Sequence, residues 1–359
     1  MKRMMRAGFL ICLLLISLVS CKQKQYNEAL DLIEQGEIEA AFDMLGEMGD
    51  DRKAQELLTH FRYVPTKIVF YYGEERAVRT YTYDEHSLLE QIVVSAPDSI
   101  YYTEHFVYDA DGRMISQSQK NVFEMTTVKE DYTYDENGNL SSMVSIASDG
   151  SVHHRYEYTY DKNGNLICET YENILGESKT VDYTYDTDGR LLRIAHTGDF
   201  SAAIEEYTYD AGGNMVRHIY VDDIDGETVK SCTYDANGNL IQEVEVYPDG
   251  GTWLRDYRYD TNGNMLRMVI TYPDGDISTT EYTYDVEGRL LLSKTTHPNG
   301  GIGTYEYTYD AHGNKMKQVY TSQRGSTESY EYEYQLVYIP FILSEKTEEM
   351  WNIEWFHGK

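Results

Sequence analysis

Tyrosine is the residue type that gives this sequence most scope for binding chemistry. The chain of 359 residues contains 35 Tyr, against nine Phe and three Trp. Tyrosine and tryptophan combine a large apolar ring with a polar group, so they can stack on a ligand and hydrogen-bond to it. Aromatic residues outside any repeated motif are therefore our candidates for ligand contact. They are Tyr171, Tyr220, Tyr247, Tyr272 and Trp253.

Catalytic and metal-binding patterns are not evident. The sequence has no HExxH, GxSxG, P-loop or Cys-x-x-Cys string, and His153-His154 is the only adjacent pair among ten histidines. Strings such as DENGN resemble calcium loops loosely but lack the closing bidentate Glu, and turn formation explains them. The sequence therefore indicates no catalytic residue, metal or cofactor, and an enzyme is the third and least favoured function.

The candidate aromatics are embedded in a repeat array. From residue 81 the chain repeats strings such as YTYDENGN (132) and YTYDKNGN (158), and the aspartates of ten units are 24 to 26 residues apart. A period of this size predicts a stacked array of identical supersecondary units.

Each Asp is expected to begin a turn. Gly follows Asp by three residues in nine of the ten units. This pattern fits a type I turn that ends in a left-handed glycine and a bulge, with the Asp side chain accepting a backbone hydrogen bond. The structural turn residues we single out are Asp135, Gly138, Asp161, Gly164, Asp235, Gly238, Asp260 and Gly263. In the first unit Ser87 replaces the glycine, and we expect a looser turn there.

The bulge also predicts which residues lie opposite one another. The tyrosine before Asp should pair with the aliphatic residue five after it, as in Tyr134 with Leu140 and Tyr259 with Met265. We therefore expect the motif tyrosines to form core, and the other aromatics to lie on an exposed sheet face, in a row along one rim. A second glycine lies 15 residues after six of the aspartates. Each unit is thus two strands and two turns.

The predicted fold is all-β: a curled antiparallel meander of about 22 strands, preceded by a short α-helical segment. A sheet of this size must curl, because open twisted sheets rarely exceed about ten strands. The motif YxYDxxG(R/N)L resembles the YD repeats of the RHS family and of tyrosine–aspartate shell proteins. This resemblance implies a β-sheet spiral or open shell, which in that family sometimes encloses a C-terminal toxin.

The N-terminus is a targeting segment. A basic stretch, MKRMMR, precedes the apolar run AGFLICLLLISLV, which is short for a transmembrane span. The following LVSC string resembles the lipobox of bacterial lipoproteins, which implies lipidation at Cys21. The expected location is extracytoplasmic, with the protein attached to the bacterial membrane through its lipid anchor.

The predicted domains are a signal peptide (1–20), a helical spacer or single tetratricopeptide-like hairpin (21–64), the YD-repeat array (65–335) and a C-terminal capping tail (336–359). The 31 Lys+Arg against 61 Asp+Glu give a net charge of −30, which excludes nucleic acid as a partner. We expect a monomeric, non-catalytic binding or scaffold module. Polysaccharide or cell-envelope glycan is the leading ligand, a surface protein is possible, and a component of an RHS-type toxin or secretion system is the alternative.

Overall fold

The computed structural model describes residues 22–49, 51–72, 75–84, 87–97, 99–122, 126–199 and 202–338. The predicted signal peptide, the predicted lipidation site Cys21 and residues 339–359 of the predicted C-terminal tail lie outside these residues. Residues 336–338, which were placed in that tail, belong to the last strand instead. The first described element is a helix over residues 22–34. It is followed by α2 (Ile38–Glu47) and α3 (Arg52–Leu58). None of the helices in these ranges has the length and apolar character needed to cross a membrane.

All described strands belong to one antiparallel sheet of 22 strands. The first eleven strands are β1 (Phe61–Tyr72), β2 (Glu75–Tyr83), β3 (Leu89–Ala96), β4 (Ser99–Tyr108), β5 (Met114–Asn121), β6 (Thr126–Tyr134), β7 (Leu140–Ile146), β8 (Val152–Tyr160), β9 (Leu166–Asn173), β10 (Ser178–Tyr185) and β11 (Leu191–Gly198). The other eleven are β12 (Ala203–Tyr209), β13 (Met215–Asp222), β14 (Gly226–Tyr234), β15 (Leu240–Val246), β16 (Thr252–Tyr259), β17 (Met265–Thr271), β18 (Ile277–Tyr284), β19 (Leu290–Thr296), β20 (Ile302–Tyr309), β21 (Lys315–Thr321) and β22 (Thr327–Tyr338).

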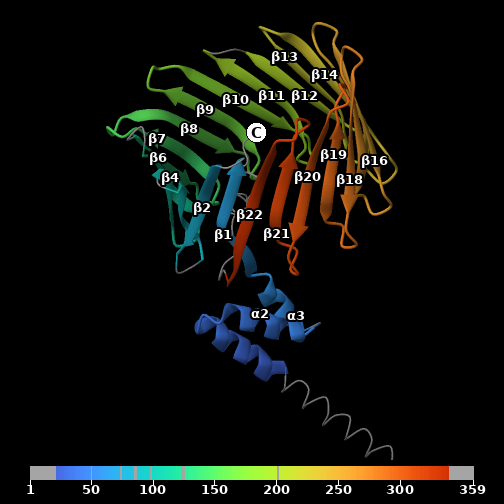
Figure 1. Ribbon diagram of the computed structural model, residues 1–359. Helices are drawn as coiled ribbons and strands as arrows, with labels where there is room; N and C mark the ends of the chain where they lie inside the picture. The colour runs from blue at the N-terminus through green and yellow to red at the C-terminus, as the bar shows by residue number, and fades with distance from the viewer. Residues whose placement is uncertain are drawn as a thin grey trace, which may run out of the picture.

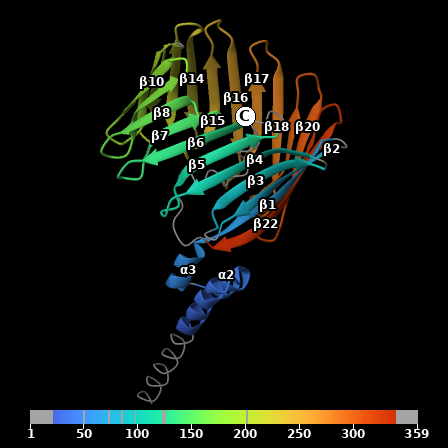
Figure 2. The same cartoon turned by 90° about the vertical axis from the view of Figure 1, so that its left-hand side faces the viewer.

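The sheet is closed, and the expectation of a spiral or open shell was wrong in this respect. Strand β1 pairs with β22 from Phe61↔Tyr338 to Tyr72↔Glu328, so the last strand returns to the first. Figures 1 and 2 show the strands wrapped around a common axis. Closure depends on β1, which precedes the first repeat. Residues 65–72 of this strand fall in the predicted β array, but residues 61–64 were wrongly placed in the helical segment. The register of this pair shifts after Pro65, a residue that cannot donate to the ladder.

One face of the sheet is regularly more buried than the other. Along β12, Glu205, Tyr207 and Tyr209 are half-buried, whereas the alternating residues Ile204 and Glu206 are exposed. Side chains converge on the concave side of a closed sheet and diverge on the convex side. The tyrosine-bearing face is therefore the inner wall, and interior and exterior positions alternate along each strand.

The apolar core is concentrated at the closing seam and under the helices. Ile68, Ile92, Phe106 and Tyr332 form a buried cluster on β1, β3, β4 and β22. A second cluster joins the helices to the two seam strands, through residues such as Leu45 and Leu336. The ring of Tyr63 on β1 lies 5.0 Å from that of His312, a YD-turn residue. The helices thus lie at the YD-turn end of the shell.

Candidate functional site

The YD turns have the predicted geometry. The Asp235 carboxylate accepts hydrogen bonds from the backbone of Asn237 and Asn239 through Oδ1, at 2.8 and 2.9 Å, and from Asn239 Nδ2 through Oδ2, at 2.9 Å. Gly238 donates its N–H to the Asp235 carbonyl and has a φ of 85°. The bulge brings Tyr234 opposite Leu240, as expected. Three further predicted turns repeat this arrangement, at Asp135 and Gly138, Asp161 and Gly164, and Asp260 and Gly263.

These bonds engage both oxygens of each turn aspartate. The hydrogen bond from the Asn239 side chain is the main cause that lowers the pKa of Asp235 below its usual value. Where Arg replaces Asn, its Nε donates to the same oxygen, as Arg190 does to Asp186 at 2.6 Å. The described residues contain no group of three or more His, Cys, Asp or Glu arranged to hold a metal ion. The aspartates in these turns thus act as turn formers.

The motif tyrosines have a structural role as well. Tyr259 donates its hydroxyl to the Leu240 carbonyl of the preceding unit at 2.9 Å. The same bond recurs from unit to unit, from Tyr108, Tyr134, Tyr160, Tyr185, Tyr209, Tyr234, Tyr284 and Tyr309. Each hydroxyl therefore reaches back to the preceding unit and satisfies one of its backbone carbonyls, and this leaves little of the tyrosine free to bind a ligand.

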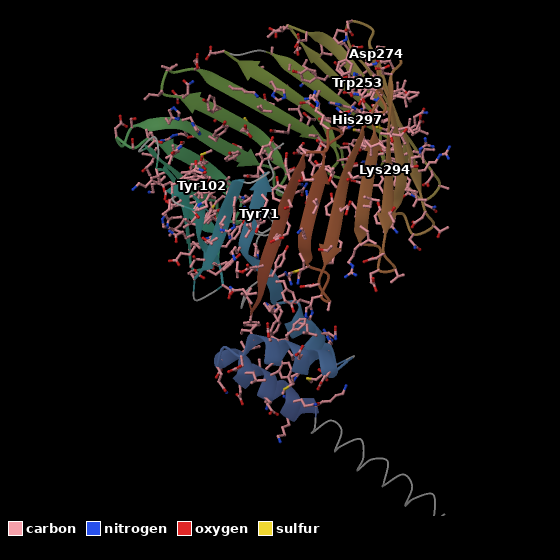
Figure 3. All side chains as sticks on the ribbon, viewed as in Figure 1. Tyr71, Tyr102, Trp253, Asp274, Lys294 and His297 are labelled. Carbon is pink, nitrogen blue, oxygen red and sulfur yellow. The ribbon has the colours of Figure 1, made fainter. Side chains whose placement is uncertain are left out.

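The candidate aromatics lie on the inner wall, at the ends of the strands away from the helices. Tyr171 pairs with Tyr156, which lies on the same face as the motif residues Tyr158 and Tyr160. The expectation of a separate exposed face was therefore wrong. The bulge after each YD turn shifts the side-chain alternation by one residue, so positions ten and twelve after Asp face inward. Figure 3 shows Trp253 near the rim opposite the helices.

Two candidates line the same hollow. It has a volume of about 600 Å³ and lies where β13, β14 and β15 reach the rim. Tyr220 and Tyr247 contribute aromatic rings, and His218, Lys230 and Glu245 contribute polar groups. We call this feature the rim hollow. Tyr247 is 36% exposed. Most of the other lining residues are polar or charged, so the hollow could take a polar ligand that also offers a flat apolar face to the two rings.

The other candidates form two further groups. Trp253 and Tyr272 make an edge-to-face pair with ring centroids 4.8 Å apart, and the Arg255 guanidinium covers Trp253 at 5.5 Å. Tyr171 packs against Tyr156, with ring centroids 4.9 Å apart. The five candidates therefore form three clusters along the inner rim.

Sequence reasoning missed several inner-wall aromatics. Tyr305 and Tyr320 lie 4.7 Å apart on β20 and β21, in the same arrangement as Tyr156 and Tyr171. The position of Tyr320 within its repeat could have identified it, because it follows Asp310 by ten residues, as Tyr171 follows Asp161.

His218 of the rim hollow belongs to a polar cluster that was also missed. The Glu205 carboxylate contacts His218 Nε2 at 2.9 Å and His196 Nε2 at 3.2 Å, and accepts the Tyr207 hydroxyl at 2.6 Å. Burial alone would raise the pKa of Glu205, but these three hydrogen bonds hold it below its usual value. The cluster comes from β11, β12 and β13, so only the paired strands bring its members together.

A family model for the teneurin YD-shell matches residues 47–175 and 167–267, together more than half of the chain. The chain belongs to the teneurin YD-shell family. This confirms the predicted YD-repeat relationship and identifies the array as a shell or scaffold module. The comparison with curated proteins gave no match.

The solved structures to which the chain is similar are distant in sequence and in overall superposition. The chain is 14% identical to a chain of the Photorhabdus luminescens Tc holotoxin pore over 72% of its own length and 18% of that chain, with a TM-score of 0.28. A chain of the TcdB2-TccC3-Cdc42 structure is 13% identical, over 73% of this chain and 20% of that chain, with a TM-score of 0.30. A porin-like protein from Bacteroides uniformis is 13% identical, over 76% of this chain and 96% of that protein, with a TM-score of 0.29. The chain thus spans about a fifth of the length of the chains matched in the first two structures.

Proposed function

We propose that this YD shell is a non-catalytic, lipid-anchored module that binds polysaccharide or cell-envelope glycan on the aromatic half of its inner wall. The rim hollow is the observation that carries the proposal. Its two tyrosine rings can stack on sugar rings, while Lys230, Glu245 and His218 offer hydrogen-bonding groups beside them. The turn aspartates and motif tyrosines already form hydrogen bonds within the fold, so they are not proposed as ligand contacts.

An extended ligand fits this wall better than a single sugar. The rim carries three aromatic clusters on β8–β9, β13–β15 and β16–β17, and Tyr305 with Tyr320 adds a fourth. One polymer chain that reaches several of these clusters gains affinity from each, because later contacts form at high effective concentration. Each cluster alone need supply only weak binding.

A lipid anchor at Cys21 would orient the shell in a way that fits this role. The helical segment that follows Cys21 packs at the YD-turn end, against Phe61 and Leu336. A lipid on Cys21 would place that end toward the membrane. The aromatic rim would then face away from it, where polysaccharide outside the membrane can reach it.

A glycan array with the mature protein tests the proposal, followed by retention on beads that carry the glycans found. We expect retention of at least one polysaccharide without release of products. The double variant Tyr220→Ala/Tyr247→Ala should lower retention by about tenfold, since each stacked ring contributes roughly 0.5–1.5 kcal/mol. Tyr101→Ala, an exposed tyrosine on β4 outside the rim hollow, is the control and should bind normally. No retained glycan, or cleavage of the bound one, would overturn the proposal.

A further inference from the structure

The rim hollow is lined by more carboxylates than nearby cations can neutralise. Two of its charged groups are paired. Lys230 Nζ lies 3.6 Å from Glu243, and Glu245 lies 3.2 Å from Arg255 Nη1. The hollow is also lined by Asp222, Asp225 and Asp249. In the part of the chain that the structure describes, the ion pairs found do not join any of these three carboxylates to a cation.

The three aspartates differ in how free they are to meet a ligand. Asp222 Oδ1 accepts the backbone N–H groups of Ile224 and Gly226 in the β13–β14 turn, and Asp249 Oδ1 accepts that of Gly251. Asp225 is exposed, and its contribution to the turn is its backbone N–H, which donates to Asp222. Burial raises the pKa of Tyr220, the carboxylate of Asp222 raises it further, and those of Glu205 and Asp225 add smaller effects.

From this arrangement we infer that the rim hollow selects amino sugars that carry a free ammonium group. The inference rests on the proposed function and specifies its ligand class. An ammonium group beside Tyr220 or Tyr247 would meet an electron-rich ring face and the carboxylate of Asp225 together. Acidic sugars would meet three uncompensated carboxylates, which disfavour them. An N-acetylated sugar keeps the stacking but loses the charge.

Calorimetric titration of the full mature protein tests this inference. The probes are short glucosamine oligomers with free amines, the matching N-acetylglucosamine oligomers, and oligolysine of equal charge. The titration is run at about pH 6, where the sugar amines are largely protonated. We expect the free-amine oligomer to bind about tenfold tighter than the acetylated one, as combined cation–π and ion-pair contacts allow. The difference should shrink as salt rises, because exposed ion pairs are screened.

A matched pair of variants locates the contact. Asp225→Asn should weaken binding of the free-amine oligomer about threefold. Asp223→Asn removes the same charge from the same turn, at an exposed residue that does not line the hollow, and should change the affinity less than about twofold. Thermal unfolding by circular dichroism checks that both variants stay folded.

The outcomes separate this inference from the proposed function. Equal affinity for free-amine and acetylated oligomers would overturn the ammonium selectivity and leave glycan binding intact. Oligolysine that binds as tightly, with the same loss in Asp225→Asn, would overturn the sugar class. Equal losses in Asp225→Asn and Asp223→Asn would move the contact away from the hollow. Absence of binding to any sugar oligomer, with no glycan retained on the array, would remove both proposals.

Discussion

At the scale of single residues, each YD turn is set by an aspartate and a residue with positive φ. The aspartate fixes the turn through its carboxylate, and the glycine supplies a left-handed conformation that other residues adopt at a cost. Ser87 has a φ of 64° and donates its N–H to the Asp84 carbonyl, as the glycines of the other units do. Ser87 thus keeps the left-handed conformation and the closing hydrogen bond without a glycine.

Ser87→Gly should stabilise the protein by about 0.5–1 kcal/mol, because relief of the left-handed strain exceeds the extra entropy of the unfolded chain. Gly238→Ala should destabilise it by about 1 kcal/mol. A new Cβ there would meet nothing closer than Asn214 Oδ1 at 3.9 Å, so the cost comes from the backbone alone. Urea midpoints of the two variants and the wild type measure both effects. Two unchanged midpoints would contradict this account of the turn.

At the scale of the turn and strand, the repeated aspartates make the fold sensitive to acid. Hydrogen bonds within each turn lower the pKa of Asp109, Asp135, Asp161, Asp186, Asp210, Asp235, Asp260, Asp285 and Asp310 in the folded chain. The unfolded chain therefore binds more protons than the folded chain once the pH falls below about 5, and stability declines from there.

We expect the urea midpoint to fall steadily as the pH is lowered from about 6 to about 3, where unfolded aspartates take up protons. Asp235→Asn keeps a side-chain oxygen for the turn but cannot titrate, so its midpoint should depend less on pH. Glu47→Gln, at an exposed helix residue, is the control and should follow the wild type. A midpoint that rises toward acid pH would contradict the role assigned to the turn carboxylates.

Local elements were predictable because their causes are local. The D-x-x-G spacing predicted the turn, the bulge and pairs such as Tyr259 with Met265. Closure was not predictable, because it joins β1 to β22 across the whole array, and β1 lacks the repeat. The rim hollow was also hidden, since its lining comes from three strands. The candidate rings Tyr220 and Tyr247 were found from the sequence, but the bulge reverses the face on which they lie.

The seam can be tested with an engineered disulfide. Tyr71 on β1 lies directly opposite Ser329 on β22. Opposed residues of antiparallel strands have Cα atoms about 4.5–5.5 Å apart, within the range of a disulfide. Tyr71→Cys/Ser329→Cys, with Cys168 and Cys232 changed to Ser, should therefore form a crosslink on mild oxidation. A shift on non-reducing gels reports it, and Tyr71→Cys alone is the control. A pair that stays reduced would argue for an open sheet.

At the scale of the whole molecule, the shell has two unlike ends. The helices lie at one end of the shell, beside the YD turns (Figure 1). The second turns lie at the other end, where Figure 3 shows Trp253 of one aromatic cluster. If the chain is anchored at its N-terminal side, the aromatic end of the shell faces away from the membrane. The hydrophobic contacts between helices and seam strands then couple the anchor to the two strands that close the sheet.

The predicted anchor has its own test. Cys21→Ser should release the protein from the membrane fraction or leave it unprocessed, because the LVSC string would lose the residue that takes the lipid. Fractionation with an immunoblot, and the mass of the mature N-terminus, measure the result. Ser20→Ala keeps Cys21 and should remain membrane-bound. Normal processing and membrane retention of Cys21→Ser would rule out lipidation at this residue.

The central claim is that glycan binds inside the closed shell, at the aromatic rim. Hydroxyl-radical footprinting of the full mature protein, with and without a saturating glycan from the array, tests it most directly. Tyr220 and Tyr247 should lose reactivity on binding. Ile204 and Val221 lie on the outer side of the neighbouring strands β12 and β13, are 40% and 38% exposed, and should react as before. Protection of Ile204 and Val221, with Tyr220 and Tyr247 unchanged, would contradict the claim.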